Sequence, residues 1–465
     1  MIPDLTTRVD VVIIGAGFAG LGAAQHLLQR TSFVVLEGRN RVGGRVMTTQ
    51  DQLPYPIDLG AAWIHHTKTN PVYESAMRLG VPIRFNHYSH GFFPKLNHQE
   101  FRHKLWPEFL KTLSREQKAI KEDSSKQDYS LREFADEFIS KNSIHQDLDI
   151  FESLLHLTYV GEYAADLKDM SLAHFDDDVE LRGSDAYLSL DKIPGGYGAI
   201  VEGLAEPLRQ HIQLNCTVTQ INNQDPSNII VSYKNKCSQS CTILAKHVIC
   251  TVSLGVLKAN SIKFCPPLPP KKQLAIDALG MAHLNKCILY WHGMETVFWP
   301  KDTEWLIRVV EPKLNLVSHA SKYDRDNNNV SSVEFVDFYN AYSLNGGLPL
   351  LVGYVAGSDA IQMEHLMDDA IVQCALHSLE CMFGHAIPSP THTIVTRWSN
   401  DPLSQGGYSF LKVNSTNQHR RDLAEPTGGL WFAGEATHTL HPATTHGAMI
   451  SGTNVAIQVL RQLSQ

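Results

Sequence analysis

Three glycines near the start of the chain have the spacing of a turn that binds a dinucleotide. Gly15, Gly17 and Gly20 follow one apolar run, and Glu37 stands at the end of the next. Gly15 permits a tight turn, Gly17 lets the backbone approach a pyrophosphate, and Gly20 lets the following helix lie close to its strand. The N-terminus of that helix attracts the anion, and Glu37 can accept hydrogen bonds from the adenosine ribose. The stretch therefore predicts a strand–turn–helix–strand unit that holds a dinucleotide.

A second glycine turn indicates which dinucleotide is bound. Gly43, Gly44 and Arg45 follow Glu37 within the sequence GRNRVGGRV. A nicotinamide enzyme does not need this extra loop, whereas a protein that encloses FAD can use it. The guanidinium of Arg45 can neutralise the pyrophosphate or reach the flavin side. The two turns together favour FAD.

A lysine within an apolar stretch could carry chemistry. Lys286 lies in LNKCILYW, which reads as a buried strand. A buried ammonium group is costly unless it has a partner or a chemical task. The alternative is an edge-strand lysine whose ammonium extends to solvent. The residues alone leave both interpretations open.

The elements that must position these residues belong to a chain of two or three domains. The 465 residues are 43% hydrophobic and 19% charged, which is typical of a globular protein with an ample core. The net charge of −8 argues against nucleic acid and suits a cationic partner. No apolar run reaches the roughly 18 residues that span a bilayer. An apolar strand begins at Val9, so we expect no signal peptide, no membrane segment and an intracellular, cytoplasmic location.

Material typical of a dinucleotide fold recurs in the middle and at the end of the chain. The later segments are IPGGYGAIVEGLA, HVICTVSLGVLK and LWFAGEATH. We therefore expect an α/β fold with a Rossmann-like FAD-binding domain assembled from residues 1–75, 192–264 and 400–465. An α+β substrate-binding domain would come from residues 76–191 and 265–399. The eight cysteines do not form a disulfide framework, and no metal site is expected.

The motifs and their order resemble the flavin amine oxidase family. The matching segments are GAGFAGLGAA, LEGRNRVGGR, DLGAAWIH, IPGGYGAIVEGLA, TVSLGVLK, LNKCILYW, RWSNDPLSQGGYSF and FAGEATHTLHPATTHGAMISG. They extend over nearly the whole chain. WIH at 63–65 and the GEATH…TTHGA ending are most similar to the polyamine oxidase branch, the N1-acetylpolyamine and spermine oxidases.

The resemblance implies oxidation of a C–N bond in a small cationic polyamine, either spermine or the N1-acetyl forms of spermine and spermidine. A hydride would pass from the carbon beside a secondary nitrogen to flavin N5, and O2 would reoxidise the flavin. The products would be H2O2, an aminoaldehyde and a shorter amine. Gly407 stands where monoamine oxidases carry the cysteine that bonds the flavin, so FAD is expected to be non-covalent. The sequence does not indicate an oligomeric state.

The same resemblance assigns roles at the substrate. Lys286 matches a lysine that holds a water beside flavin N5, and His65 matches a position that hydrogen-bonds the substrate amine. Tyr408 matches one of the two aromatic residues that flank the substrate amine in this family. The position of the other falls near Thr444, so only one side of this aromatic cage is expected. The expected catalytic residues are thus Lys286, His65 and Tyr408. The substrate-binding set is His65, Trp63, Trp398, Tyr408 and Thr444.

Cofactor contacts are expected from several separated segments. Glu435, after the strand LWFAG, would lie near the ribityl or pyrophosphate group. A helix that begins near Thr445 would direct its N-terminus at the flavin C2 carbonyl and stabilise the reduced ring. The full predicted set is Gly15, Gly17, Gly20, Glu37, Arg39, Gly43, Gly44, Arg45, Gly60, Ala61, Ala62, Trp63, Val218, Trp398, Gly434, Glu435, Thr444, Thr445 and Ala448.

An acidic run could attract a polycation to the substrate domain. The run comprises Asp176, Asp177, Asp178 and Glu180, with Glu162 and Asp169 nearby. Such a run is more often a solvated surface. If functional, it would raise the local substrate concentration.

Other functions stay open. A monoamine oxidase is disfavoured by Gly407, and an amino acid oxidase would want an arginine for a carboxylate, for which no candidate stands out. A histone-lysine oxidase is expected to carry a long helical insertion and a partner domain, for which this chain has no room. A non-catalytic FAD-fold escort protein would lose Lys286, Glu435 or the second glycine turn, and all three are present.

Overall fold

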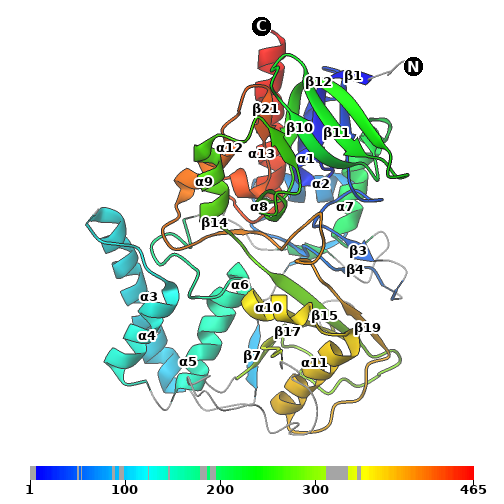
Figure 1. Cartoon of the computed structure of the whole chain (residues 1–465). Helices are drawn as coiled ribbons and strands as arrows, with labels where there is room; N and C mark the ends of the chain where they lie inside the picture. The colour runs from blue at the N-terminus through cyan, green and yellow to red at the C-terminus, as the bar shows by residue number, and fades with distance from the viewer. Residues whose placement is uncertain are drawn as a thin grey trace. The chain divides into compact units, whose positions relative to one another are not determined.

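The computed structural model describes residues 7–49, 52–53, 55–85, 89–93, 99–123, 125–144, 147–177, 186–188, 195–309, 333–342 and 347–465. The chain divides into two compact units (Figure 1). Unit 1 comprises residues 1–86, 174–281 and 398–465, and unit 2 comprises residues 87–173 and 282–397.

An eight-stranded mixed sheet forms the centre of unit 1. Its strands run in the order β13-β10-β11-β12-β1-β2-β9, and β21 pairs with β12. The pairs of β1 with β2 and with β12 are parallel, as the predicted nucleotide-binding unit requires. The strands are β1 (Thr7–Ile14), β2 (Phe33–Leu36), β9 (Ile212–Gln213), β10 (Thr217–Asn222), β11 (Ile229–Lys234), β12 (Ser240–Cys250), β13 (Lys263–Cys265) and β21 (Leu430–Phe432).

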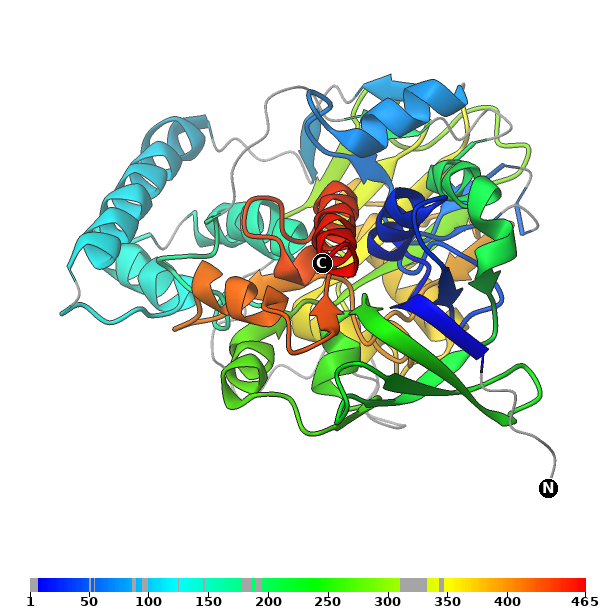
Figure 2. The same ribbon diagram turned by 90° about the horizontal axis from the view of Figure 1, so that it is seen from above.

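Two helices from opposite ends of the chain pack side by side in unit 1. They are α1 (Phe18–Leu27) and α13 (Thr445–Leu463), and Figure 2 shows α13 end-on beside α1. Small residues make this close approach possible: a Cβ added at Gly452 would lie 1.9 Å from the Ala19 carbonyl oxygen, and one at Gly22 would lie 2.7 Å from the Met449 carbonyl oxygen. The side chains of both helices join one apolar core with β1 and β2.

Shorter elements complete unit 1. They are β3 (Thr48–Thr49), β4 (Ile57–Asp58), β5 (Trp63–Ile64), α2 (Pro71–Leu79), β6 (Ile83–Phe85), β8 (Ala186–Leu188), α7 (Tyr197–Ala205), η2 (Glu206–His211), α8 (Leu254–Lys258), α9 (Pro270–Ala278), β14 (Leu279–Met281), β20 (Ser409–Leu411), α12 (Asn417–Ala424) and η3 (Glu435–Thr437). The segment IPGGYGAIVEGLA thus contributes α7 to unit 1, and its first two residues, 193–194, lie outside the described part of the chain.

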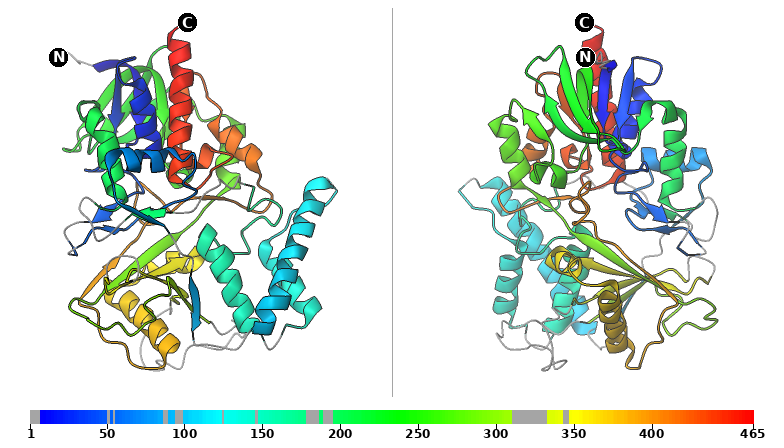
Figure 3. Two further views of the ribbon diagram at one scale, coloured as in Figure 1. Left: turned by 180° about the vertical axis from the view of Figure 1, so that it is seen from behind. Right: turned by 45° about the vertical axis from the view of Figure 1, so that its right-hand side comes forward.

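Unit 2 contains a six-stranded sheet in the order β19-β15-β18-β17-β16-β7. Its helix α11 lies along one face (Figure 3) and packs on an apolar core that includes Cys287, Leu289 and Leu351. The elements are β7 (His90–Phe93), α3 (Gln99–Glu122), α4 (Leu131–Asn142), α5 (Leu148–Leu155), η1 (His156–Val160), α6 (Gly161–Tyr163), β15 (Leu284–Tyr290), β16 (Trp305–Arg308), β17 (Asp337–Asn340), β18 (Leu350–Ala356), α10 (Gly357–Met363), α11 (Asp368–Phe383) and β19 (His392–Val395). The strand predicted around Lys286 is confirmed as β15.

Candidate cofactor and amine site

The first glycine turn joins β1 to α1 and is closed by Glu37. The Ala16 N–H donates to one carboxylate oxygen of Glu37 and the Arg39 N–H donates to the other, both at 2.8 Å. Gly15 has φ +101°, a conformation that glycine adopts without strain. A Cβ at Gly20 would lie only 1.9 Å from the Gly15 carbonyl oxygen, so a side chain there would force α1 away from the turn.

The second glycine turn lies against the first. The Gly43 N–H donates to the Ala16 carbonyl oxygen at 2.9 Å, and a Cβ at Gly44 would lie 3.5 Å from the Gly17 Cα. At Gly17 the nearest atom to an added Cβ is 3.9 Å away, so packing within the protein does not require glycine there. Gly17 caps α1 without a side-chain hydrogen bond, which leaves the N–H groups at the N-terminus of α1 available to an anion. The two turns therefore form a recess lined by backbone, which fits a pyrophosphate.

Arg41 shapes this recess, although the sequence did not single it out. Its guanidinium donates to three carbonyl oxygens of the second turn, at Val42 (3.0 Å), Gly44 (2.9 Å) and Val46 (2.9 Å). Burial and then the neighbouring Arg39 lower the pKa of Arg41. No local pattern distinguishes it from the other arginines of GRNRVGGRV, because its role is defined by the folded loop.

Two other predicted cofactor residues have structural partners on this side. The Arg39 guanidinium forms an ion pair with Asp401 at 2.6 Å and donates to the Ser404 hydroxyl at 2.8 Å. Val218 is buried in β10, where the pairing with β11 is irregular. The segment that leads into β10 pairs with the end of β2, since the Cys216 N–H donates to the Glu37 carbonyl oxygen at 2.8 Å. The predicted adenine contact of Val218 stays a prediction.

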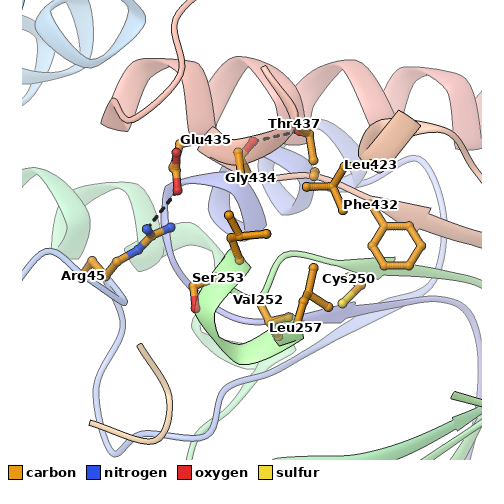
Figure 4. Close-up of a pocket in the computed structure, with 13 residues that line it drawn as sticks. Arg45, Cys250, Val252, Ser253, Leu257, Leu423, Phe432, Gly434, Glu435 and Thr437 are labelled. Carbon is orange, nitrogen blue, oxygen red and sulfur yellow. Dashed lines mark hydrogen bonds and ion pairs between the residues drawn. The ribbon is translucent and has the colours of Figure 1, made fainter. Parts of the chain in front are cut away.

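Arg45 and Glu435 form an ion pair at a small pocket. Their side chains lie 3.0 Å apart, and Arg45 also donates to the Gly407 carbonyl oxygen at 2.6 Å. Figure 4 shows the two side chains directed toward each other, with apolar groups such as Leu257 and Phe432 elsewhere in the lining. Gly434, also predicted, lines the same pocket. A basic group and an acidic group thus face the same space beside the second glycine turn.

Glu435 is buried and remains ionised because of its partners. Burial alone would raise its pKa, but Arg45, the Ser409 hydroxyl and Arg420 together hold the pKa of this carboxyl below its ordinary value. Ser409 donates its hydroxyl to Glu435 at 2.6 Å, and the wholly buried Arg420 donates to Ser409 at 2.6 Å. Neither Ser409 nor Arg420 was predicted, because both act through contacts that are distant in sequence.

The carboxylate of Glu435 also joins the segments that carry Tyr408 and Thr444. One oxygen accepts from the Ser409 N–H at 3.3 Å and from the Ala443 N–H at 2.9 Å. Tyr408 precedes Ser409, and Thr444 follows Ala443 as the N-cap of α13, where its hydroxyl accepts from the Gly447 N–H at 3.0 Å. The two positions predicted for the sides of the amine cage therefore lie on segments that one carboxylate holds together.

The segment of residues 60–63 lies along Arg45. The Ala61 N–H donates to the Arg45 carbonyl oxygen at 3.3 Å, and a Cβ at Gly60 would lie 1.9 Å from that same oxygen. Trp398 donates its indole N–H to the Leu59 carbonyl oxygen at 3.1 Å and lies against Gly60. Trp63 is in β5, whose partner is β8. The structure thus brings Gly60, Ala61 and Trp398 to Arg45.

The remaining predictions on α13 differ in what they contact. The Thr445 hydroxyl hydrogen-bonds the buried phenol of Tyr197, and burial raises the pKa of that phenol. Ala448 is half-buried and packs against the core of β1 and α1. Thr445 therefore already has a protein partner, whereas the N-terminus of α13 remains the predicted group for the flavin.

His65 belongs to a group of histidines. The rings of His438 and His441 stack 5.1 Å apart, and the ring of His446 lies 5.0 Å from that of His441. His446 is 1% exposed, and burial, then His441, His65, His66 and His438, lower its pKa to about 3. Burial and then His441 lower the pKa of His438 to about 4. The imidazoles of His438 and His446 are therefore neutral near neutral pH and add no positive charge to this part of unit 1.

Lys286 belongs to unit 2, where it is 4% exposed on β15. Its backbone N–H donates to the Thr396 hydroxyl at 2.8 Å, and its ammonium nitrogen lies 5.6 Å from the ring centre of Tyr354. It is therefore not an edge lysine extending to solvent, and that alternative is wrong. Its predicted place beside flavin N5 stays a prediction.

The acidic run is only partly described. Asp178 and Glu180 lie outside the described residues. Asp177 forms an ion pair with His174 at 2.5 Å, and Asp176 is exposed. Glu162 and Asp169 are also exposed. These placements leave the predicted role in attracting substrate as a prediction.

A comparison with protein families decides the class of this site. The model of flavin containing amine oxidoreductases matches residues 18–460, nearly the whole chain. The chain belongs to this family. The family assignment confirms the predicted flavin cofactor, FAD, and the predicted α/β amine oxidase fold. A redesigned triple mutant of putrescine oxidase has the same fold, with a TM-score of 0.74 and 19% identity over 98% of this chain and 100% of that one.

The relatives of this chain include proteins named as polyamine oxidases and proteins named as histone demethylases. Polyamine oxidase 2 of Arabidopsis thaliana is 32% identical over 96% of this chain and 87% of its own length. Lysine-specific histone demethylase 1 homolog 2 of the same plant is 33% identical over 99% of this chain and 59% of its own length. With two further demethylase homologues the match covers 52% and 30% of their lengths, so the chain spans about half the length of these relatives or less.

These relatives correct one argument from the sequence. A histone demethylase was expected to differ from this chain by a long helical insertion. The match to the demethylase homologue extends over 490 residues, only slightly more than the 465 of this chain. No long insertion therefore separates the two within the matched region, and that argument does not exclude a peptidyl lysine substrate.

Three further findings concern the described part of this chain. None of its helices is long and apolar enough to cross a membrane. No group of three or more His, Cys, Asp and Glu side chains there could hold a metal ion. All eight cysteines are free thiols.

Proposed function

We propose that this flavin amine oxidase is a polyamine oxidase that uses non-covalently bound FAD. The substrate would be spermine or an N1-acetylated spermine or spermidine, oxidised at the carbon beside a secondary nitrogen. The observation that carries the proposal is the position of Glu435. Its carboxylate joins Arg45 of the second glycine turn to the segments of Tyr408 and Thr444. One carboxylate therefore connects a segment expected at the cofactor with the two segments expected at an amine.

FAD, when bound, supplies an acceptor for the hydride at N5 and passes the electrons to O2. The protein would position the amine, exclude water from it and tune the reactivity of the flavin. We assign the pyrophosphate to the recess between Gly17 and Gly44, and the flavin edge to the segment of residues 60–63. The absence of any close contact at Gly17 supports this assignment, since an added Cβ there would lie 3.9 Å from the nearest protein atom and would not clash.

The protein groups would then keep the reacting nitrogen neutral and correctly aligned. A neutral amine is needed because its lone pair assists departure of the hydride. His65 would hydrogen-bond the amine and help to keep it neutral, while the neutral imidazoles of His438 and His446 would add no positive charge. Tyr408 would form a wall that excludes water. Lys286 would hold the water that assists reoxidation or hydrolyses the imine. The products are an aminoaldehyde, a shorter amine and H2O2.

Anaerobic bleaching tests the proposal. The purified yellow protein should lose its flavin absorbance when spermine or N1-acetylspermine is added, and H2O2 should form when air is admitted. A methylated histone peptide and a monoamine are tested in the same way as alternative substrates. Bleaching by the peptide but not by spermine would replace the proposal with a demethylase, which the 33% identity to demethylase homologues supports as the second candidate. No bleaching with any amine would overturn both.

A further inference from the structure

One face of the six-stranded sheet in unit 2 carries a row of polar and aromatic side chains. Lys286 on β15 is paired with Tyr354 on β18, and Tyr354 is paired with Asp337 on β17. Directly paired residues of antiparallel strands project to the same face. Lys286, Tyr354 and Asp337 therefore form a row across three neighbouring strands. The opposite face is different, because its residues, among them Cys287 and Phe338, belong to the apolar core beneath α11.

Asp337 is a buried carboxylate with little compensation. It is 5% exposed, and the one basic side chain near it in the described part of the chain is His156, whose Nε2 lies 3.5 Å from a carboxylate oxygen. Among the described residues it makes no side-chain hydrogen bond and no ion pair with Lys286. Burying a carboxylate without hydrogen bonds is costly, and buried polar groups usually have partners. The position therefore has capacity for a further donor.

His156 reaches Asp337 from an unusual element. It begins η1, a π-helix of five residues between α5 and α6. Such insertions are rare and occur often at functional sites. A Cβ at the following Gly161 would lie 3.9 Å from the second carboxylate oxygen of Asp337. The end of this helix therefore lies directly over the carboxylate.

Aromatic rings surround the same position. Trp305 lies 5.5 Å from the ring of Tyr354 and 5.5 Å from the ring of Tyr339. Tyr354 already attracts one ammonium group, that of Lys286, at 5.6 Å. The faces of such rings attract cations, and the effect grows when the cation is desolvated. A carboxylate and several rings on one buried face are chemically suited to an ammonium group.

We propose that Asp337, with Tyr354 and Trp305, binds a second, positively charged nitrogen of the amine substrate. The inference rests on the proposed function, because it assumes that Lys286 lies at the reacting nitrogen. Lys286 and Asp337 are two strands apart, about 10 Å at the usual strand spacing. Several methylenes between two nitrogens can span that distance. The subsite would select a polyamine over a monoamine.

The experiment compares Asp337→Asn with Asp368→Asn in the FAD-loaded enzyme. Asp368 is an acidic residue of the same unit whose side chain is 61% exposed and pairs with Arg397. The probes are spermine, which carries several nitrogens, and dibutylamine, which carries one. Asp337→Asn should weaken spermine binding, measured by anaerobic calorimetry, roughly 10- to 100-fold, and should leave dibutylamine unchanged. Asp368→Asn should alter neither.

The outcomes separate this inference from the proposed function. If wild-type enzyme binds spermine but is not bleached by it, the oxidase proposal fails while the binding ratio still tests Asp337. Equal spermine affinity in wild type and Asp337→Asn, or equal losses for both amines, would overturn the inference. So would wild-type enzyme that does not bind spermine. If Asp337→Asn does not fold, Tyr354→Leu replaces it, with the same selective loss expected and the same results counting against it.

Discussion

The carboxylate of Glu435 shows how single residues hold this site together. It accepts from Arg45, from the Ser409 hydroxyl and N–H, and from the Ala443 N–H, and it stays charged although buried. A charge in that position is stable only while its partners remain. Its loss would leave Arg45 and the buried Arg420 without their carboxylate.

We expect Glu435→Gln to lower the free energy of unfolding by about 3 kcal/mol, because it breaks a mostly buried ion pair. It should also reduce the FAD content of the purified protein. Urea denaturation and flavin absorbance measure the two effects. Glu425→Gln is the matched control, since Glu425 is 61% exposed and pairs with Lys271. Equal stability of the two variants would show that the Glu435 network contributes little.

Lys286→Met should keep FAD and slow turnover by roughly 100-fold or more, the range that a proton-handling side chain supplies. Stopped-flow measurement of flavin reduction and reoxidation would identify the affected step. Lys301→Met removes another lysine of unit 2 whose ammonium lies over an aromatic ring, 5.3 Å from that of Tyr342, and it should have no effect. Unchanged rates in Lys286→Met would leave the lysine a structural residue only.

The buried histidines predict how stability depends on pH. His438 and His446 take up protons near pH 6.5 when unfolded, but only at about 4 and about 3 in the folded protein. Their depressed pKa values mean that stability is full above pH 6.5 and falls progressively as the pH drops toward 4. The thermal unfolding midpoint should follow this course. His446→Gln should flatten it, whereas exposed His365→Gln should not, and an unaltered slope in His446→Gln would contradict the assignment.

At the scale of elements, two glycines distinguish binding from packing. A Cβ at Gly17 would make only an ordinary contact at 3.9 Å, whereas a Cβ at Gly452 would lie 1.9 Å from a carbonyl oxygen of α1. Gly17→Ala should therefore change stability by less than about 1 kcal/mol while weakening FAD binding. Gly452→Ala should lower stability by about 2 kcal/mol or more because it separates α1 from α13. Denaturation curves measure the stability of both variants, and FAD titration of the apoprotein measures their FAD binding. Tight FAD binding by Gly17→Ala would show that the pyrophosphate does not bind at Gly17.

Local elements were predictable because their signals are local. The turn around Gly15, the strand around Lys286 and the start of α13 follow from spacing within short stretches. The parts that the sequence could not supply depend on long-range contacts. Arg420 is found only through Ser409 and Glu435, and the row from Lys286 to Asp337 requires the pairing of β15, β18 and β17. Glu37 has the predicted position, yet its visible partners are the N–H groups of Ala16 and Arg39.

At the scale of the whole molecule, the cofactor and the choice of substrate depend on different sets of residues. The family assignment and the glycine turns account for the cofactor, and relatives with two kinds of substrate match the chain with 32 and 33% identity. Neither the family assignment nor the glycine turns distinguish a polyamine from a methylated lysine. We propose that the substrate is selected by the sheet face of Asp337 in unit 2 and by the segments of Tyr408 and Thr444 in unit 1.

The contact of α1 with α13 has a consequence for the newly made chain. The first helix packs on a partner that begins at Thr445, so the part of its surface that α13 covers stays exposed until residues 445–463 are translated. At about 5–20 residues per second this interval is roughly 20 to 80 s. The nucleotide recess cannot be completed during that time, and the nascent chain must be kept from aggregating. FAD would therefore be taken up only after α13 has been translated.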